Sequence, residues 1–212
     1  YKIHVSTDSS IKNSVSLDHE GVVVGVSITG RAYAININSG ELVWQRDLPG
    51  YPFRWIYSRP AIADGIVYFG GKAGYQALDV ETGKQVWYKV LTVPKGSGDP
   101  VGDGWGSYPG PITYRGLLIL HLSGIGLVAL DRETGEFLWA TPTIAQNVII
   151  SIDGATGAVT ENSEVVFSAL GQQVLACPNM HGGKDWEAGS YSPLTNTMYF
   201  PLRNMCQRLL AT

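Results

Sequence analysis

The sequence predicts an all-β fold, a β-propeller built from small antiparallel sheets, and three observations lead to it. A pattern of Ala-x-Asp/Asn, a turn that ends in glycine, and a tryptophan occurs three times, at residues 34–44, 77–87 and 129–139. Its tryptophans are 43 and 52 residues apart, which suits one four-stranded sheet per copy with a loop of variable length. One such sheet cannot bury both of its faces, so neighbouring sheets are expected to stack around an axis.

Each copy of the pattern encodes a strand, a tight turn and a second strand. In the central copy, the Asp79 carboxylate is expected to fold onto the amides of the turn, and Gly83 supplies the positive φ that closes the hairpin. Trp87 is expected to lie as a wedge between adjacent sheets, where an aromatic ring buries about 150–250 Å². Trp44 and Trp139 stand at the same point of the other copies, so we expect three equivalent slots.

Four blades are predicted, and residues 1–212 are treated as one propeller segment. Their approximate limits are 17–50, 58–93, 108–143 and 147–212. Two-residue hairpin turns support the second and third blades, Asp64-Gly65 and Arg115-Gly116. A weaker fourth copy of the pattern, residues 151–157, keeps the turn and places Thr160 where a tryptophan would stand.

The composition restricts the classes of partner. With 44% apolar and 16% charged residues, the chain resembles an ordinary globular domain, and its net charge of −3 gives no basic field for nucleic acid or anionic lipid. No apolar run approaches the roughly 18–20 residues of a membrane span, and no basic-then-apolar leader begins at Tyr1. The chain begins without methionine, so it is either a mature form or a piece of something longer.

Two loops contain residues of types that can bind ligands. Residues 94–110 are rich in glycine and proline and predict a surface loop. Asp99 and Asp103 do not alternate as a calcium loop requires, so a solvated connection is expected there. Aromatic loop residues leave a carbohydrate-binding propeller as one alternative: Phe53, Trp55, Tyr57 and Trp105.

The repeated pattern resembles the repeat of pyrroloquinoline quinone (PQQ) type propellers. That group includes quinoprotein alcohol and methanol dehydrogenases as well as cofactor-free propellers such as the outer-membrane assembly scaffold. The repeat therefore implies a β-propeller of PQQ-like repeats and does not by itself imply a reaction. Residues 17–116 resemble generic repeats of this kind.

A later segment resembles the quinoprotein alcohol dehydrogenases more specifically. In that family a Cys-Pro precedes Gly-Gly-Lys-Asn-Trp, a Tyr-Ser-Pro turn follows, and a strand ends in Asn-x-Cys. This chain has Cys177-Pro178, then residues 182–186, then residues 191–193, and finally Asn204-Met205-Cys206. The resemblance implies a disulfide between the two cysteines, and with it an oxidising compartment, so a periplasmic or secreted protein is expected.

The resemblance also suggests which residues contact a cofactor. Asp185 stands where the family has an asparagine that hydrogen-bonds the quinone, and Trp186 takes the adjacent aromatic position. An ionised carboxylate only accepts hydrogen bonds and repels the reduced, anionic quinone, so Asp185 would have to be protonated or turned away. The alternative is that residues 182–186 form a tight turn that delivers one more packing tryptophan.

The leading hypothesis is a segment of a PQQ-dependent quinoprotein dehydrogenase that oxidises alcohols. The resemblance implies PQQ and calcium as cofactors, a small alcohol as substrate, and an eight-bladed propeller completed by remaining blades or a protein partner. The family's catalytic aspartate, adjacent cysteine pair, quinone-polarising basic residue and calcium ligands are not found in this sequence. The competing hypothesis is a non-catalytic propeller that acts as a protein-interaction scaffold of the outer-membrane assembly type.

Overall fold

The computed structural model describes residues 7, 9–11, 14–49, 58–71, 74–90, 110–122, 126–155, 157–179, 183 and 189–212. Regular structure in these ranges consists of β-strands and one short 3-10 helix, η1 (Ser163–Val165). None of the helical structure in these ranges is long and apolar enough to cross a membrane.

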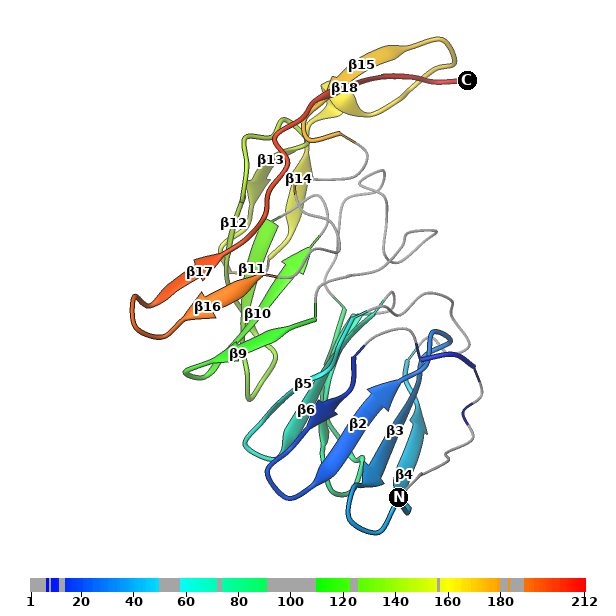
Figure 1. Cartoon of the computed structure of the whole chain (residues 1–212). Coiled ribbons are helices and arrows are strands. Elements are labelled where there is room, and N and C mark those ends of the chain that lie inside the picture. The colour runs from blue at the N-terminus through cyan, green and yellow to red at the C-terminus, as the bar shows by residue number, and fades with distance from the viewer. Residues whose placement is uncertain are drawn as a thin grey trace.

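Three four-stranded antiparallel sheets follow one another along the chain (Figure 1). The first contains β1 (Ser16–Leu17), β2 (Val22–Val26), β3 (Arg31–Asn36) and β4 (Leu42–Asp47). The second contains β5 (Ala61–Ala63), β6 (Ile66–Gly71), β7 (Gly74–Asp79) and β8 (Gln85–Lys89). The third contains β9 (Ile112–Tyr114), β10 (Leu117–Leu122), β11 (Gly126–Asp131) and β12 (Phe137–Thr141). In each sheet the strands pair in chain order, and the first strands of neighbouring sheets contact one another. The predicted all-β architecture of stacked blades is therefore confirmed.

The predicted two-residue turns join the first two strands of the second and third sheets. Asp64 and Gly65 have φ values of 50° and 73°, and Arg115 and Gly116 have values of 43° and 79°. Two successive residues with positive φ give the turn whose twist matches that of paired strands.

The turn that ends in glycine has the same hydrogen bonds in successive sheets. Asp79 Oδ1 accepts from the Thr82 backbone N–H (2.7 Å) and hydroxyl (2.6 Å), and Gly83 N donates to the Asp79 carbonyl (2.9 Å). Asp131 Oδ1 accepts from the same two groups of Thr134, at 2.8 and 3.0 Å. These contacts confirm that the carboxylates close the hairpins as predicted.

A pH dependence of stability follows from these turns. The Thr82 hydroxyl lowers the pKa of Asp79, and the Thr134 backbone N–H lowers the pKa of Asp131. A carboxyl with a lowered folded pKa stabilises the fold fully above its ordinary pKa of 3.8, and this stabilisation is lost as pH falls through the folded value. We expect the urea unfolding midpoint to drop below about pH 4.

The matched variant is the double substitution Asp79→Asn and Asp131→Asn. Asn36 occupies the equivalent place in the first sheet and accepts from Asn38 N and Ser39 N, so an asparagine fits the turn. The variant should show a shallower fall of the midpoint as the pH drops below about 4. An identical fall in both proteins would exclude the turns as its source.

Apolar side chains fill the space between adjacent sheets. Val24, Ala34, Val67 and Leu78 belong to one buried cluster between the first and second sheets. The second cluster joins the second and third sheets: Tyr68, Tyr75, Ala77, Trp87, Leu118, Leu120, Val128 and Leu130. Burial raises the pKa of Tyr68 to about 12, so its phenol stays neutral at physiological pH.

Trp44 and Trp87 occupy equivalent slots between sheets. Each lies opposite a small residue on the neighbouring strand, Ala34 and Ala77 respectively. Each ring lies against the turn glycine of the next sheet: a Cβ on Gly83 would be 2.8 Å from Trp44 Cδ2, and one on Gly135 would be 2.8 Å from Trp87 Cδ2.

Each indole also donates to the carbonyl that follows the turn aspartate. Trp44 Nε1 donates to Val80 O (2.8 Å), and Trp87 Nε1 donates to Arg132 O (3.0 Å). The prediction of a repeated wedge is confirmed for these two tryptophans.

The prediction of a third equivalent slot is wrong for Trp139. Trp139 pairs with Ala129 as expected, yet it is 39% exposed, and Phe137 instead lies against Gly157, the turn glycine of the next hairpin. Only 18 residues separate Trp139 from Gly157, whereas 48 separate Trp87 from Gly135. Between Trp139 and Gly157 the described residues contain no pair of strands like β9 and β10. The turn glycine of the next hairpin therefore lies against Phe137, which precedes Trp139 by two residues in β12.

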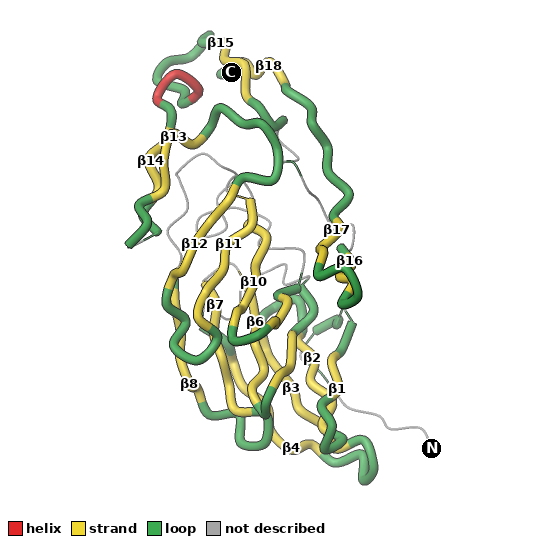
Figure 2. The backbone as a smooth tube through the Cα atoms, turned by 90° about the vertical axis from the view of Figure 1, so that its left-hand side faces the viewer, coloured by secondary structure: helices red, strands yellow, loops and turns green. Residues whose placement is uncertain are grey.

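Beyond β12, the described residues form three two-stranded pairs in place of one four-stranded sheet. These are β13 (Ile149–Ile152) with β14 (Val159–Glu161), β15 (Gln173–Ala176) with β18 (Gln207–Leu210), and β16 (Ser190–Ser192) with β17 (Thr197–Tyr199). The β15–β18 pair lies at the end of the molecule farthest from the first sheet (Figures 1 and 2). The division of the chain into blades at the predicted limits stays a prediction.

The β13–β14 hairpin is the predicted weak copy of the pattern. Gly157 N donates to the Asp153 carbonyl (2.9 Å), and Thr160 pairs with Ser151 as the tryptophans pair with alanine elsewhere. Thr160 therefore lies opposite the residue equivalent to alanine, as predicted, although Glu161 is the residue that follows its turn glycine by four positions, as each tryptophan does.

Candidate functional site

The two ends of the strands differ in the three four-stranded sheets. One end carries the hairpin turns, at residues 64–65, 80–84, 115–116 and 132–136. At this end Arg132 of the third sheet forms an ion pair with Asp64 of the second sheet. At the opposite ends of the strands, β4 and β8 end and β7 and β11 begin. The loop segments considered next, around residues 50–57 and 91–109, follow β4 and β8 in the sequence. The loop residues considered for ligands belong to those segments and lie outside the described residues: Phe53, Trp55, Tyr57, Asp99, Asp103 and Trp105.

At the opposite ends of the strands, two positions require glycine because a carbonyl of the neighbouring strand lies very close. Gly74 begins β7 with φ of 132°, and Gly126 begins β11 with φ of 122°. A Cβ on Gly74 would overlap the carbonyl oxygen of Lys89, and one on Gly126 would overlap that of Thr141. Neither glycine is among the residues predicted from the sequence, although both stand three residues before the repeated alanine.

The cysteines form the predicted disulfide, Cys177–Cys206. It lies next to the paired residues Ala176 and Gln207, so it continues the β15–β18 ladder by one step. Asn179 N donates to Met205 O (2.7 Å) just beyond it. The chain between the two cysteines is therefore a closed loop fixed at its base.

Within the run that resembles the quinone segment, Gly183 is the residue that the structure describes. Asp185 and Trp186, the predicted cofactor contacts, lie outside the described residues. Gly183 is buried, its carbonyl accepts from Arg203 N (2.7 Å), and a Cβ there would be 2.5 Å from Ile144 Cδ1. The glycine therefore lies where the loop meets the connection between β12 and β13.

Asn147 in the same connection ties the base of the loop to the β13–β14 hairpin. Its Nδ2 donates to Leu175 O (2.8 Å), its Oδ1 accepts from Cys177 N (2.8 Å), and its own N–H donates to Cys177 O (2.9 Å). The Asn147 carbonyl in turn accepts from Asn162 Nδ2 (2.8 Å). Asn147 is not among the residues predicted from the sequence, where its one signal is a polar Gln146-Asn147 pair ahead of an apolar strand.

The β16–β17 hairpin is held against β9 by two tyrosines. Tyr114 and Tyr191 both donate to Asn196 Oδ1, at 2.7 and 2.9 Å, and their ring centroids are 5.2 Å apart. This hairpin is part of the chain between Cys177 and Cys206, and it lies against β9, the first strand of the third sheet.

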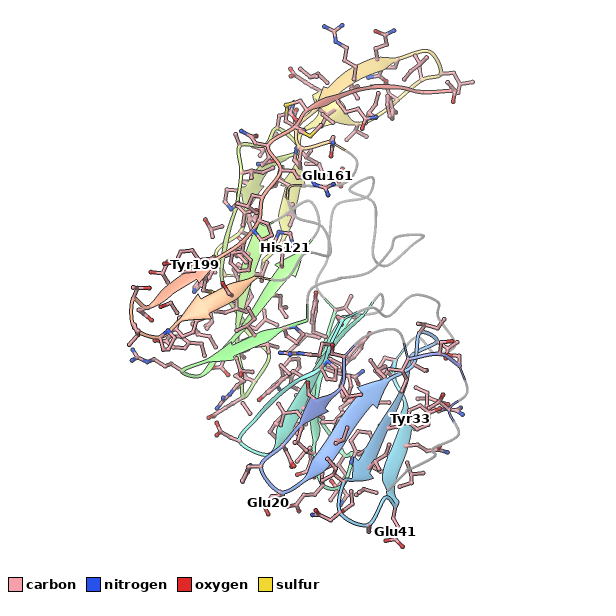
Figure 3. The ribbon with its side chains drawn as sticks, viewed as in Figure 1. Glu20, Tyr33, Glu41, His121, Glu161 and Tyr199 are labelled. Carbon is pink, nitrogen blue, oxygen red and sulfur yellow. A yellow bond between two sulfur atoms is a disulfide. The ribbon has the colours of Figure 1, made fainter. Side chains whose placement is uncertain are left out.

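The described residues contain no arrangement that suggests catalysis by itself. No group of three or more His, Cys, Asp or Glu in the described ranges is placed to hold a metal. His121 lies in β10 (Figure 3) and is 8% exposed, in agreement with a core histidine. These residues supply a scaffold and a disulfide-closed loop.

Comparison with known proteins identifies the family. A family model described as outer membrane protein assembly factor BamB, of the PQQ-repeat type, matches residues 5–198. The chain belongs to the PQQ-repeat family. Residues 5–198 include all three four-stranded sheets, so family membership rests on the repeated blades.

Relatives in the PQQ-repeat family include both enzymes and assembly factors. Quinoprotein alcohol dehydrogenase PedH of Pseudomonas putida is 28% identical over 203 residues, which cover 87% of this chain and 32% of PedH. Lanthanide-dependent methanol dehydrogenase of Methylacidiphilum fumariolicum is 32% identical over 131 residues, 59% of this chain and 21% of that protein. Outer membrane protein assembly factor BamB of Burkholderia pseudomallei is 26% identical over 187 residues, 84% of this chain and 45% of that protein.

Solved structures of PQQ-repeat dehydrogenases share the fold. Quinohemoprotein alcohol dehydrogenase ADHIIG of Pseudomonas putida HK5 superposes with a TM-score of 0.57 at 20% identity, over 88% of this chain and 42% of that one. A europium-containing methanol dehydrogenase gives a TM-score of 0.52 at 17% identity, over 92% and 52%. The chain spans about a third of the length of PedH and less than half of that of the assembly factor.

Proposed function

We propose that this chain is part of a PQQ-dependent quinoprotein dehydrogenase that oxidises alcohols. The observation that carries the proposal is the Cys177–Cys206 disulfide, which closes the loop whose sequence resembles the quinone-binding segment of that family. The match to PedH over 87% of the chain supports the same choice. A disulfide persists in oxidising compartments, which favours a periplasmic or secreted protein.

The proposed cofactor contacts are Asp185 and Trp186. PQQ, when bound, would supply the two-electron acceptor for oxidation of the alcohol. Trp186 offers an aromatic face to the quinone ring. Asp185 fits a quinone oxygen only when its carboxyl is protonated and can donate a hydrogen bond, so PQQ affinity should depend on the protonation of this group. No calcium ligand is assigned, because the described residues hold no suitable group.

A non-catalytic scaffold is the second candidate. The description of the matching family model as an outer membrane protein assembly factor favours it, as does the Burkholderia pseudomallei relative. A chain of this kind would display its loops to protein partners and would bind no quinone.

A PQQ titration of purified protein in the presence of calcium, followed by quinone absorbance and dye reduction, separates these candidates. We expect saturable binding to the wild type. The matched variant Asp185→Asn restores a donor and removes a negative charge, so it should bind PQQ about tenfold more tightly at pH 7, the worth of one added hydrogen bond. Trp186→Ala should bind more weakly.

The advantage of Asp185→Asn should shrink as pH falls and the Asp185 carboxyl becomes protonated. Absence of PQQ binding in both the wild type and Asp185→Asn would favour the scaffold. Equal affinities at every pH would place Asp185 away from the quinone.

A further inference from the structure

The connection between β12 and β13 touches the disulfide-closed loop at two separate points. Ile144 lies against Gly183 inside the loop, and Asn147 binds Leu175 and Cys177 at its base. Both contacts come from one short stretch of chain, and they lie on opposite sides of Cys177 in the sequence. Such an arrangement restrains both the position and the direction in which the chain leaves the disulfide.

Asn147 makes hydrogen bonds to the backbone of β15 and Cys177 of the kind that a neighbouring strand would make. The side chain of an asparagine presents one acceptor and one donor side by side, as a peptide group does. Here the acceptor takes Cys177 N, the donor reaches Leu175 O, and the backbone N–H of Asn147 adds a bond to Cys177 O. Three polar backbone groups of residues 175–177 are thereby satisfied by one residue.

The opposite end of Asn147 is itself fixed. Its carbonyl accepts from Asn162 Nδ2, and Asn162 N donates to Val148 O (2.8 Å). Asn162 also caps η1 through Glu164 N. Asn147 therefore links the β13–β14 hairpin, through half-buried Asn162, to the strand that leads into the loop, at half-buried Cys177 and exposed Leu175.

We propose that Asn147 is a positioning residue for Leu175 and Cys177 at the base of the disulfide-closed loop, and through them for the PQQ-binding residues of that loop. The inference rests on the proposed function, because the loop is assigned to PQQ there. Asn147 lies outside the loop, and its proposed role is to fix the position of the loop and not to bind the cofactor. Removal of the Asn147 side chain leaves the Cys177 N–H and Leu175 carbonyl without these partners, and the base of the loop is expected to shift or loosen.

The test compares Asn147→Ala with Asn162→Ala. Asn162→Ala disturbs the same hairpin and the cap of η1 but leaves the bonds to residues 175–177 in place, so it controls for a purely structural effect. Two readouts are measured: the PQQ dissociation constant, and the rate at which dithiothreitol reduces the Cys177–Cys206 disulfide in folded protein. Urea unfolding midpoints of the two variants establish that they are compared at similar stability.

We expect Asn147→Ala to raise the PQQ dissociation constant about tenfold or more, as displaced binding groups do, and to speed reduction of the disulfide by a similar factor. Asn162→Ala should change both by less than about threefold. Asn147→Asp keeps the acceptor for Cys177 N and loses the donor to Leu175 O, so it should fall between the wild type and Asn147→Ala.

The outcomes separate the two proposals. PQQ binding by the wild type with equal affinity in Asn147→Ala would overturn the positioning role and leave the proposed function intact. No PQQ binding by the wild type would overturn the proposed function and the cofactor part of this inference together. In that event the reduction rates still decide whether Asn147 anchors the loop, and equal rates in the two alanine variants would reject that as well.

Discussion

Replacement of Trp87 by alanine is expected to lower the free energy of unfolding by about 3–5 kcal/mol. The ring is 7% exposed, lies in the cluster between the second and third sheets, contacts Gly135 and donates to Arg132 O. Alanine would leave a cavity and an unsatisfied carbonyl at the same interface. Equilibrium urea unfolding measures the loss.

Trp139→Ala is the matched control for Trp87→Ala. Trp139 has the same register opposite alanine, yet it is 39% exposed, and the turn glycine of the next hairpin, Gly157, lies against Phe137 instead, so its replacement should cost about 1 kcal/mol or less. Similar losses for the two variants would contradict the unequal slots described above and would restore the sequence-based expectation of three equivalent wedges.

Gly135→Ala is expected to destabilise the protein by about 2–5 kcal/mol. Gly135 has φ of 71°, and an added Cβ would come within 2.8 Å of Trp87 Cδ2 and Cε3. The loss therefore combines a backbone cost, about 1–2 kcal/mol for an alanine in this region, with the cost of an overfilled interface, about 1–3 kcal/mol. Thermal and urea unfolding both report it.

Gly116→Ala is the control that measures the backbone part of this destabilisation alone. Gly116 has φ of 79° and nothing within 4 Å of an added Cβ, so its replacement should cost only about 1–2 kcal/mol. In a Trp87→Ala background, the cost of Gly135→Ala should fall close to the same level, because the ring is gone and the other close atom, Lys89 Cγ at 2.9 Å, belongs to a flexible side chain. A full-sized loss in that background would show that the Trp87 contact is not the cause.

The repeated turn made most of the fold predictable from sequence. Its aspartate, glycine and tryptophan are local features with fixed spacing, and the structure forms the expected hairpins at residues 36–40, 79–83 and 131–135. Two of the three wedges were also correct, because the sheet that follows each of them is complete. Trp139 failed because its environment depends on how many residues precede the next hairpin, which the pattern itself does not encode.

Less of the candidate site than of the fold could be predicted from the sequence. The cysteine pairing came from family resemblance and is present in the structure. Asn147 and the two strand-initial glycines Gly74 and Gly126 were missed, since each depends on a carbonyl from a distant part of the chain. The roles of Asp185 and Trp186 stay predictions.

The disulfide between Cys177 and Cys206 joins residues 29 positions apart. A protease that cuts once anywhere between them leaves both fragments covalently joined, and β15 and β18 keep their pairing partners on either side of the nick. Limited digestion should therefore yield a species of unchanged mass on a non-reducing gel that separates into two bands only after thiol treatment.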